Sequence, residues 1–330
     1  MSFTGQSGKG GNKKVRGMPR AKIISFINYK GGVGKTTTTY HVGCSLAQHY
    51  NKKVLLVDID PQTNLTFLCA PPEKWEAFKK KAGTIATMYQ RFQGRKALDT
   101  KRFIWRSPIQ AGRYRIPNVD LIPCDVDLLG EDLGGGQLAG AFPSFEALKK
   151  QASEFLRERL FLKRALQEVD DQYDYILIDC PPNIYLMTQN AIVASNWYII
   201  TAIPDHLSTI GLRILWTKVN RIKKLIESAQ TFTGDSKKKI EVAELGGIIF
   251  VKIRIGGSVV TNTHFDRMQR ISSMPEFAGF CFQVYTTELI GFSEAAENNV
   301  PVWMLDTANA RRAAGKRAYE QITDELLRRV

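Results

Sequence analysis

A glycine- and lysine-rich turn directly after a short apolar run is the feature of this sequence best suited to chemistry. The run covers 23–27 (IISFI), and the turn at 30–38 reads KGGVGKTTT. Glycines let backbone N–H groups point into such a turn, so that it can hold the phosphates of a nucleotide. Lys35 can reach the β- and γ-phosphates, and the Thr36 hydroxyl can be a ligand of Mg²⁺. A helix beginning near Lys35 would direct its positive end at the same phosphates.

Three carboxylates stand where two later apolar runs end. Asp58 and Asp60 lie in VDIDPQTN, and Asp179 lies in DCPP. Side chains at i and i+2 of a strand end point the same way, and at the carboxyl edge of a parallel sheet they face the ligand crevice. Acidic residues in an ordinary turn would look the same, but their order after the phosphate-binding turn favours nucleotide chemistry. Asp179 would then hold Mg²⁺ through water, because Mg²⁺ keeps several waters when protein ligands are few.

The form Lys-Gly-Gly-x-Gly-Lys-Thr resembles the deviant Walker A loop of the ParA/MinD family of ATPases. In that family the additional lysine reaches across a nucleotide-sandwich dimer to the partner's ATP. The resemblance therefore implies that Lys30 acts in trans and Lys35 in cis. VDIDPQTN resembles the family's Walker A′ segment, which implies that Asp60 positions the attacking water and that Asp58 lies near the metal. Asp179 matches the Walker B carboxylate.

The same resemblance implies ATP and Mg²⁺ as cofactors, and it extends over about 22–330. It places Asn190 close to the hydrolytic site, and Pro204 and Asp205 in the loop that contacts the base. The expected catalytic residues are Lys30, Lys35 and Asp60, and the expected metal ligands are Thr36 and Asp179. The expected nucleotide contacts are Lys30, Gly31, Gly32, Val33, Gly34, Lys35, Thr36, Thr37, Asp58, Asn190, Pro204 and Asp205.

Apolar runs that do not alternate with polar residues predict strands covered on both faces. With helical segments between them, they predict one α/β domain at 21–330, with a mostly parallel twisted sheet and helices on both faces. A basic, apolar-poor segment at 1–20 is expected to be a disordered tail. The expected strands are 23–27, 53–58, 119–123, 173–179, 197–202, 246–251 and 282–285, and the expected helices include 148–169 and 209–228.

The positive charge is concentrated in two segments. Of 330 residues, 46 are Lys or Arg and 32 are Asp or Glu, which gives +14. Residues 1–22 carry +6 and residues 72–118 carry +9, so the rest of the chain is close to neutral. Such an excess favours an anionic partner, either nucleic acid or an acidic membrane surface. Five scattered cysteines without metal-ligand spacing, and no apolar run of about 18 residues, predict a soluble cytoplasmic protein.

The DNA-binding surface is not transferable from the family. ParA relatives contact DNA through segments that correspond to 252–261 and 286–292, and the second has no Lys or Arg here. Residues 72–118 interleave cations with aromatics, a pattern that fits contacts to DNA or a partner and equally fits aromatic packing. The candidate DNA contacts are Lys79, Lys80, Lys81, Arg267, Arg270, Arg311, Arg312, Lys316 and Arg317, with Lys252 and Arg254 as further candidates by composition.

By resemblance, the protein would be a slow, Mg²⁺-dependent ATPase that forms a homodimer with ATP and binds DNA non-specifically. It would associate with the nucleoid and segregate or position a plasmid, a chromosome or another cargo. A ParB-like or other adaptor would stimulate hydrolysis. The alternative is a membrane-cycling ATPase of the MinD or flagellar type, in which the helix containing Tyr319, Ile322 and Leu326 lies on a membrane rather than in the core. A third class is a metabolic or redox enzyme on this fold. The absence of paired cysteines argues against a redox enzyme, and ATP turnover without a small acceptor would argue against an amidotransferase-type synthetase.

Overall fold

The computed structural model describes residues 20–330, except 112–113, 134–143, 235–238, 257–258, 289–290 and 306–309. The expected basic tail at 1–20 therefore lies outside the described residues, apart from Arg20.

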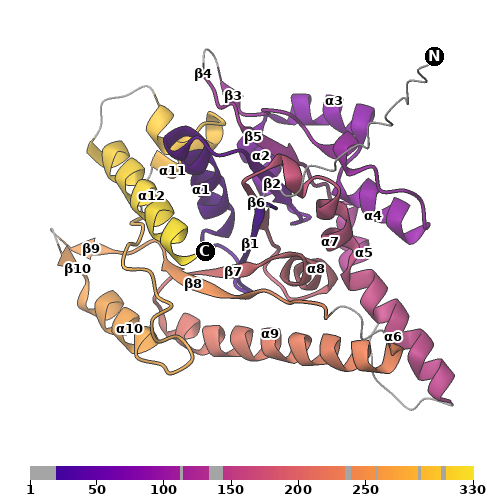
Figure 1. The fold of residues 1–330 in the computed structure, drawn as a ribbon. Coiled ribbons are helices and arrows are strands. Elements are labelled where there is room, and N and C mark those ends of the chain that lie inside the picture. The colour runs from indigo at the N-terminus through magenta and orange to yellow at the C-terminus, as the bar shows by residue number, and fades with distance from the viewer. Residues whose placement is uncertain are drawn as a thin grey trace, which may run out of the picture.

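A six-stranded parallel sheet forms the centre of the described chain, in the order β5-β2-β6-β1-β7-β8 (Figure 1). The predicted α/β fold with a mostly parallel sheet is confirmed. The strands of this sheet are β1 (Lys22–Ile27), β2 (Val54–Asp58), β5 (Val119–Ile122), β6 (Tyr175–Asp179), β7 (Trp197–Ala202) and β8 (Glu244–Phe250). Two small antiparallel pairs are formed by β3 (Gln110–Ala111) with β4 (Tyr114–Arg115), and by β9 (Ile255–Gly256) with β10 (Val259–Val260).

Helices cover both faces of the sheet, as Figure 1 shows. One face packs against α1 (Lys35–Tyr50), α2 (Asn64–Cys69) and α12 (Ala310–Arg329). The other packs against α4 (Ile85–Gln93), α6 (Phe145–Arg159), α7 (Phe161–Gln167), α8 (Leu186–Ala194) and α9 (His206–Thr233). The remaining helices are α3 (Pro72–Ala82), α5 (Leu128–Leu133), α10 (Asn262–Ser272) and α11 (Gly291–Glu297), with short 3₁₀ turns η1 (Thr100–Phe103), η2 (Asp170–Gln172) and η3 (Val302–Met304).

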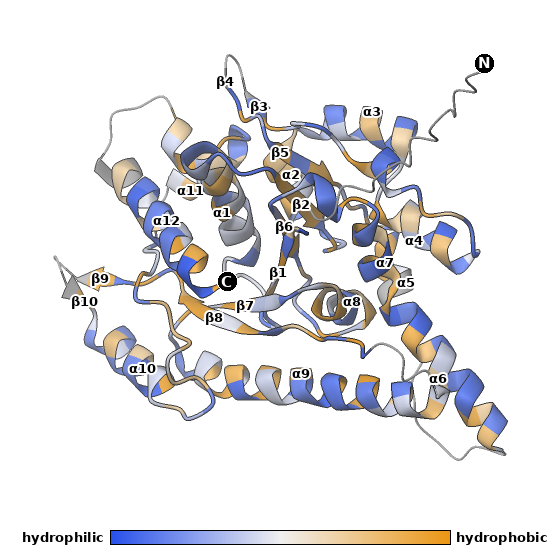
Figure 2. Ribbon diagram, in the orientation of Figure 1, coloured by the Kyte–Doolittle hydropathy of each residue, from blue (hydrophilic) through white to orange (hydrophobic). Residues whose placement is uncertain are grey.

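Both faces of each central strand are buried, which explains why the apolar runs do not alternate. In β1, Ile23 and Ile27 belong to the core on the α8–α9 side, whereas Ile24 and Phe26 belong to the core on the α1–α12 side. Successive strand side chains point to opposite faces, so apolar residues occupy nearly every position, and Ser25 is the buried polar exception in β1. Figure 2 shows the result, with hydrophobic residues concentrated on the strands and many hydrophilic ones on α6 and α12.

The predicted helix at 148–169 is wrong as one element, because the chain bends at Leu160 into α6 and α7. The buried side chain of Asn190 stabilises the bend. Its Oδ1 accepts the Leu162 N–H at 3.1 Å, and its Nδ2 donates to the Glu158 carbonyl at 3.0 Å. These bonds satisfy backbone groups that a continuous helix would have paired internally.

The predicted strand at 282–285 is also wrong. The Gln283 N–H donates to the Glu325 carboxylate of α12, and the Arg329 guanidinium donates to the Cys281 carbonyl at 2.9 Å. The Phe282 N–H still donates to the Ile248 carbonyl of β8 at 2.8 Å, but the pairing there is confined to an isolated bridge between Cys281 and Ile248, while α12 binds the backbone groups on the other side of the segment.

The C-terminal helix α12 uses its apolar residues for packing. Tyr319, Ile322 and Leu326 are buried in the same core as α1. This favours the core-packing interpretation of that helix over a membrane-surface one. None of the five cysteines forms a disulfide, and no helix in the described part of the chain could cross a membrane.

Candidate functional site

The glycine-rich turn joins the carboxyl end of β1 to the start of α1. Gly32 and Gly34 have φ of 73° and 70°, in the left-handed region that favours glycine. Gly34 is the N-cap of α1, and a Cβ there would lie 3.4 Å from Cγ2 of Val251, just beyond the end of β8. The first N–H groups of α1 are therefore directed at the space above the turn, where the helix dipole favours an anion.

A cavity of about 560 Å³ lies against this turn. It brings together the turn, the segment after β2, the segment after β6 and part of the C-terminal region. Its lining residues are Gly31, Gly32, Val33, Gly34, Lys35, Thr36, Thr37, Asp60, Gln62, Asn64, Phe67, Leu68, Pro182, Lys252 and Ala296. We call it the nucleotide pocket. Of the residues expected to contact nucleotide, it contains all of 31–37 but neither Lys30 nor Asp205.

Lys35 is buried in the pocket beside two carboxylates. Burial lowers the pKa of Lys35, whereas the charges of Asp179 and Asp60 oppose this shift. The Lys35 Nζ also donates to the Lys30 carbonyl at 3.4 Å. A lysine kept here by nearby acids is positioned to bind phosphate oxygens.

Asp179 ends β6 with a fully buried carboxylate. Neither of its oxygens makes a hydrogen bond of normal geometry with a described residue; the Thr36 hydroxyl is near it, but not in that geometry. Burial raises its pKa well above the usual range, the neighbouring Asp58 raises it further, and the Thr36 hydroxyl and Lys35 oppose the shift. A buried carboxylate without a partner is costly unless a cation completes it, so Asp179 and Thr36 fit a Mg²⁺ ion.

Asp58 and Asp60 follow β2 but have different environments. Asp60 lines the pocket, where its Oδ1 accepts the Gln62 N–H at 3.0 Å, and burial raises its pKa. Asp58 is completely buried and accepts hydrogen bonds from Thr66 N–H at 2.8 Å, Thr66 Oγ1 at 2.7 Å and Asp60 N–H at 3.1 Å. Burial raises its pKa to about 7, although the Thr66 hydrogen bonds oppose this. Asp58 therefore holds the segment that carries Asp60, rather than lining the pocket.

Lys30 points away from the nucleotide pocket. Its Nζ donates to Oδ2 of Asp205 at 2.6 Å, and Asp205 is also the N-cap of α9, accepting the Ser208 N–H through Oδ1 at 2.7 Å. The adjacent Tyr29 lies against Gly211 of α9, where a Cβ would be 2.9 Å from the Tyr29 hydroxyl oxygen. Residues 29–30 are thus held on the first turns of α9.

Two other expected nucleotide contacts lie elsewhere. Asn190 is fully buried and stabilises the bend between α6 and α7, outside the nucleotide pocket. Pro204 is buried just after β7 and does not line the pocket.

Lys252, named above only as a DNA candidate, lines the nucleotide pocket. It has a φ of 54°, while its neighbours Val251 and Ile253 are buried and hold the strained backbone in place. Left-handed backbone at a non-glycine residue costs energy and occurs often at functional sites. Its position beyond β8 was the available signal, because carboxyl ends of parallel strands border the ligand crevice.

The candidate DNA contacts are scattered over the surface. Lys79 is already paired, with Asp125 at 3.3 Å and Asp127 at 3.4 Å, whereas Lys80 and Lys81 are exposed. Arg267 and Arg270 lie on α10, and Lys316 pairs with Glu320 at 3.7 Å on α12, next to the exposed Arg317. The side chains of Arg311 and Arg312 lie outside the described residues.

Aromatic residues of 72–118 serve packing. Tyr89, Phe92 and Phe103 are buried, and Trp105 stacks on Phe78 with ring centroids 4.9 Å apart. Base stacking by the buried rings is excluded, which supports the packing interpretation for them.

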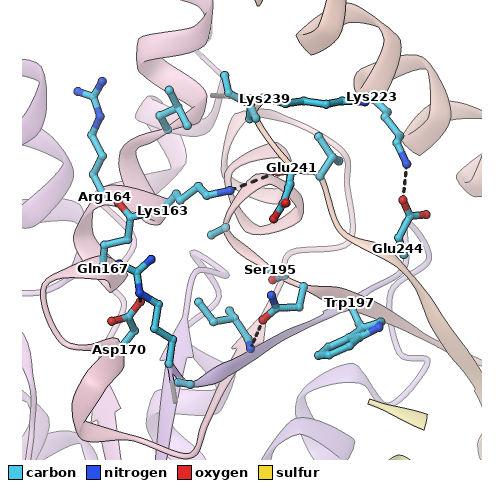
Figure 3. Close-up of a pocket in the computed structure, with 18 of the residues that line it drawn as sticks. Lys163, Arg164, Gln167, Asp170, Ser195, Trp197, Lys223, Lys239, Glu241 and Glu244 are labelled. Atoms are coloured by element: carbon cyan, nitrogen blue, oxygen red, sulfur yellow. Dashed lines mark hydrogen bonds and ion pairs between the residues drawn. The ribbon is translucent and has the colours of Figure 1, made fainter. Parts of the chain in front are cut away.

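A larger cavity of about 930 Å³ lies near the amino-terminal ends of β1, β7 and β8, away from the phosphate-binding turn (Figure 3). Most of its charges are neutralised in place. Lys223 pairs with Glu244, as drawn in Figure 3, and Arg20 lies 3.7 Å from Asp170. This arrangement leaves the nucleotide pocket as the stronger candidate site.

Known proteins match most of this chain. A family profile described as an AAA domain matches residues 21–231. The chromosome-partitioning ATPase Soj of Treponema pallidum (strain Nichols) is 27% identical over 308 residues, covering 93% of this chain and 98% of that protein. The sporulation initiation inhibitor protein Soj of Bacillus subtilis (strain 168) is 34% identical over 203 residues, or 62% and 66% of the two chains. A Cyanothece McdA variant in complex with ATP has the same fold, with a TM-score of 0.63 and 17% identity over 93% of this chain and 96% of that one.

Proposed function

This chain belongs to the ParA/MinD family of P-loop ATPases, and on that premise we propose that it hydrolyses ATP in a nucleotide-dependent homodimer that binds DNA and partitions or positions a cargo. The observation that carries the ATPase proposal is the buried, unpartnered carboxylate of Asp179 beside Lys35 and Thr36. The partition role rests on similarity to the two Soj proteins.

The phosphate-binding turn, Lys35, Thr36, Asp60 and Asp179 have separate tasks in this proposal. The N–H groups of the turn and Lys35 bind the β- and γ-phosphates of ATP, which lowers the cost of charge that develops as the terminal phosphoryl group leaves. Asp60 accepts a hydrogen bond from the attacking water and orients it in line with the bond that breaks. Mg²⁺, held by Thr36 and Asp179, would offset the negative charge of the phosphates.

Lys30 is proposed to act in trans. It lies outside the nucleotide pocket, bonded to Asp205, and so contributes nothing to phosphate binding in its own subunit in this arrangement. If Lys30 contacts the partner's ATP, hydrolysis requires the dimer, and turnover is slow until a partner such as a ParB-like adaptor favours assembly.

DNA binding is proposed to follow dimerisation. A dimer doubles the number of phosphate contacts available to a basic protein, so affinity rises with ATP and falls with salt. The apolar face of α12 is buried, which favours DNA binding over membrane cycling.

The proposal is tested by gel shift with a random-sequence duplex at two salt concentrations, in ADP and in ATP, with the parent and Lys30→Ala. We expect ATP-dependent shifts only for the parent. Equal shifts in all states would contradict the switch, and ATP-dependent sedimentation with liposomes in place of DNA binding would favour the membrane-cycling class.

A further inference from the structure

A basic hollow separate from the two cavities above is lined by α4, α6, α7 and the segment that follows α4. Its volume is about 570 Å³, and none of its lining residues lines the nucleotide pocket. It is lined by Phe92, Arg95, Lys96, Leu98, Ser153, Glu154, Arg157 and Arg164. We call this the α4–α6 hollow.

Most of its positive charge has no acidic partner. Glu154 is the single carboxylate in the lining, and it pairs with Arg157. That hydrogen bond lowers the pKa of Glu154, and the charge of Arg95 contributes to the shift. The side chains of Arg95, Lys96 and Arg164 make no ion pair with any residue that the structure describes. Cations gathered in a hollow repel one another, and an anion entering the hollow would offset that repulsion.

A hydrogen-bonded turn after α4 fixes the backbone at Arg95 and Lys96. Their N–H groups donate to the carbonyls of Phe92 at 3.0 Å and Arg91 at 2.9 Å. The Arg91 guanidinium closes the turn by donating to the Ala97 carbonyl at 2.8 Å. Cations on an ordered turn lose less conformational freedom on binding than cations on a flexible loop.

Arg157 and Arg164 complete the hollow from the other two helices. Their guanidinium carbons lie 5.2 Å and 5.9 Å from the centre of the Phe92 ring, so the ring supports both cations. Arg164 is also at the rim of the larger cavity, and Figure 3 shows it pointing away from Asp170 and Glu241. It is therefore available to a ligand in the α4–α6 hollow.

We propose that the α4–α6 hollow binds the phosphate backbone of duplex DNA. Guanidinium groups match phosphate oxygens in geometry. Lys101 and Arg102 are also exposed, on η1, which contacts α4, and further cations near the hollow suit an extended polyanion better than a single phosphate. The apolar lining residues Phe92 and Leu98 are only 7% and 9% exposed, so the hollow offers little apolar surface to an acidic peptide and no ring to a base.

The proposal rests on the DNA binding proposed above and locates its surface. The test variant combines Arg95→Asn, Lys96→Gln and Arg164→Gln. Asn suits position 95 because φ there is 55°, a conformation that Asn tolerates. A second variant, the α3 control, removes the same number of charges from exposed lysines of α3, by Lys74→Gln, Lys80→Gln and Lys81→Gln. Because Lys80 and Lys81 are competing candidates for DNA contact, this variant also tests α3 as the alternative surface.

Affinity for a short random-sequence duplex is measured by fluorescence anisotropy in saturating ATP over a range of salt concentrations. Each phosphate contact contributes about −0.9 to the slope of log K against log salt, so three lost contacts reduce the slope by roughly 2–3 for each engaged subunit. The test variant should lose about tenfold or more in affinity, with ATP turnover and the thermal unfolding midpoint unchanged. The α3 control should keep a slope within about 1 of the parent's.

An unchanged affinity and slope in the test variant would overturn the proposal, and a loss confined to the α3 control would assign the surface to α3 instead. If the test variant kept DNA binding but lost stimulation by an acidic adaptor peptide, the hollow would be a peptide site and the proposal wrong. If the parent bound no duplex with ATP or ADP, the proposed DNA-binding function would fail, and the assignment of the hollow with it.

Discussion

The ion pair between Lys30 and Asp205 competes with any role of Lys30 in a second subunit. In the monomer, the Lys30 ammonium is held 2.6 Å from Asp205, and it must leave before it can reach a partner's phosphate. Asp205→Asn removes the charge that holds it. Asn is as good an N-cap as Asp, so a side-chain oxygen at position 205 still accepts the Ser208 N–H, and α9 still begins at the same place.

The size of the effect follows from the exposure of the pair. The two side chains are 34% and 36% exposed, so solvent screening limits the pair to about 1 kcal/mol. A symmetric dimer must break two such pairs, or about 2 kcal/mol, which corresponds to about a 30-fold change in the dimer dissociation constant. Although burial raises the pKa of Asp205, the hydrogen bonds from Lys30 and Ser208 outweigh this and lower it. The pair is therefore present at neutral pH and is lost only in acid, as the pH falls below the ordinary range of an Asp carboxyl.

Analytical ultracentrifugation in saturating ATP measures the dimer dissociation constant of the parent and of Asp205→Asn. We expect the variant to dimerise about 30-fold more tightly with ATP and no differently with ADP. Asp205→Ala, which loses the cap as well, separates this effect from simple destabilisation of α9. Because Asp205 is also an expected base contact, the ATP dissociation constant of each variant is measured separately. Unchanged or weaker dimerisation at full ATP occupancy would refute the idea that this pair restrains Lys30.

Three further predictions concern the pocket and the core. Lys252→Asn keeps the left-handed backbone but removes the charge, and should weaken ATP binding by about tenfold in isothermal calorimetry, whereas Lys252→Arg should not. If Lys252→Asn bound ATP as tightly as the parent, Lys252 would not contact the nucleotide. Gly43→Ala should lower stability by about 1 kcal/mol in urea denaturation, because its Cβ would lie 2.7 Å from Leu56 Cδ2 and overpacking outweighs the gain in helix propensity; a stabilised variant would disprove this. Burial lowers the pKa of His41 to about 4, so the unfolded chain binds the extra proton and His41 alone should remove about 1.6 kcal/mol of stability from pH 6.5 to 5. The raised pKa values of Asp58 and Asp179 act in the opposite direction, so the effect is measured as the difference in pH slope between the parent and His41→Gln, and equal slopes would argue against it.

The sheet could be predicted because its strands are short, buried on both faces and separated by clear turns. The predicted strand at 197–202 matches β7 at both ends, and the other five strands of the sheet begin or end within two residues of their predicted bounds. The order of the strands brings the carboxylates of the site together. β6 pairs with both β1 and β2, so Asp179 ends beside Asp58 although 121 positions separate them in the chain.

Other features depended on contacts that no local pattern contains. The bend at Leu160 is held by Asn190, and the chain at 281–283 is bound by Glu325 and Arg329, all distant in sequence. Asp58 and Asp60 look equivalent in VDIDPQTN, but only the fold decides that Thr66 encloses the first. The basic segment at 72–118 was recognisable from composition, whereas its division into a paired Lys79 and unpaired Arg95 and Lys96 depends on neighbours in space.

The central claim is that each active site is shared, with Asp60 in one subunit and Lys30 from the other. Mixing Lys30→Ala with Asp60→Ala tests it most directly, since each homodimer lacks one of the two groups but a mixed dimer contains one complete site. With random pairing, ATP turnover per subunit should recover to about a quarter of the parent's, from two proteins that are each inactive alone. A mixture no more active than its separate components would contradict the shared site and would indicate that Lys30 does not act on the partner's ATP.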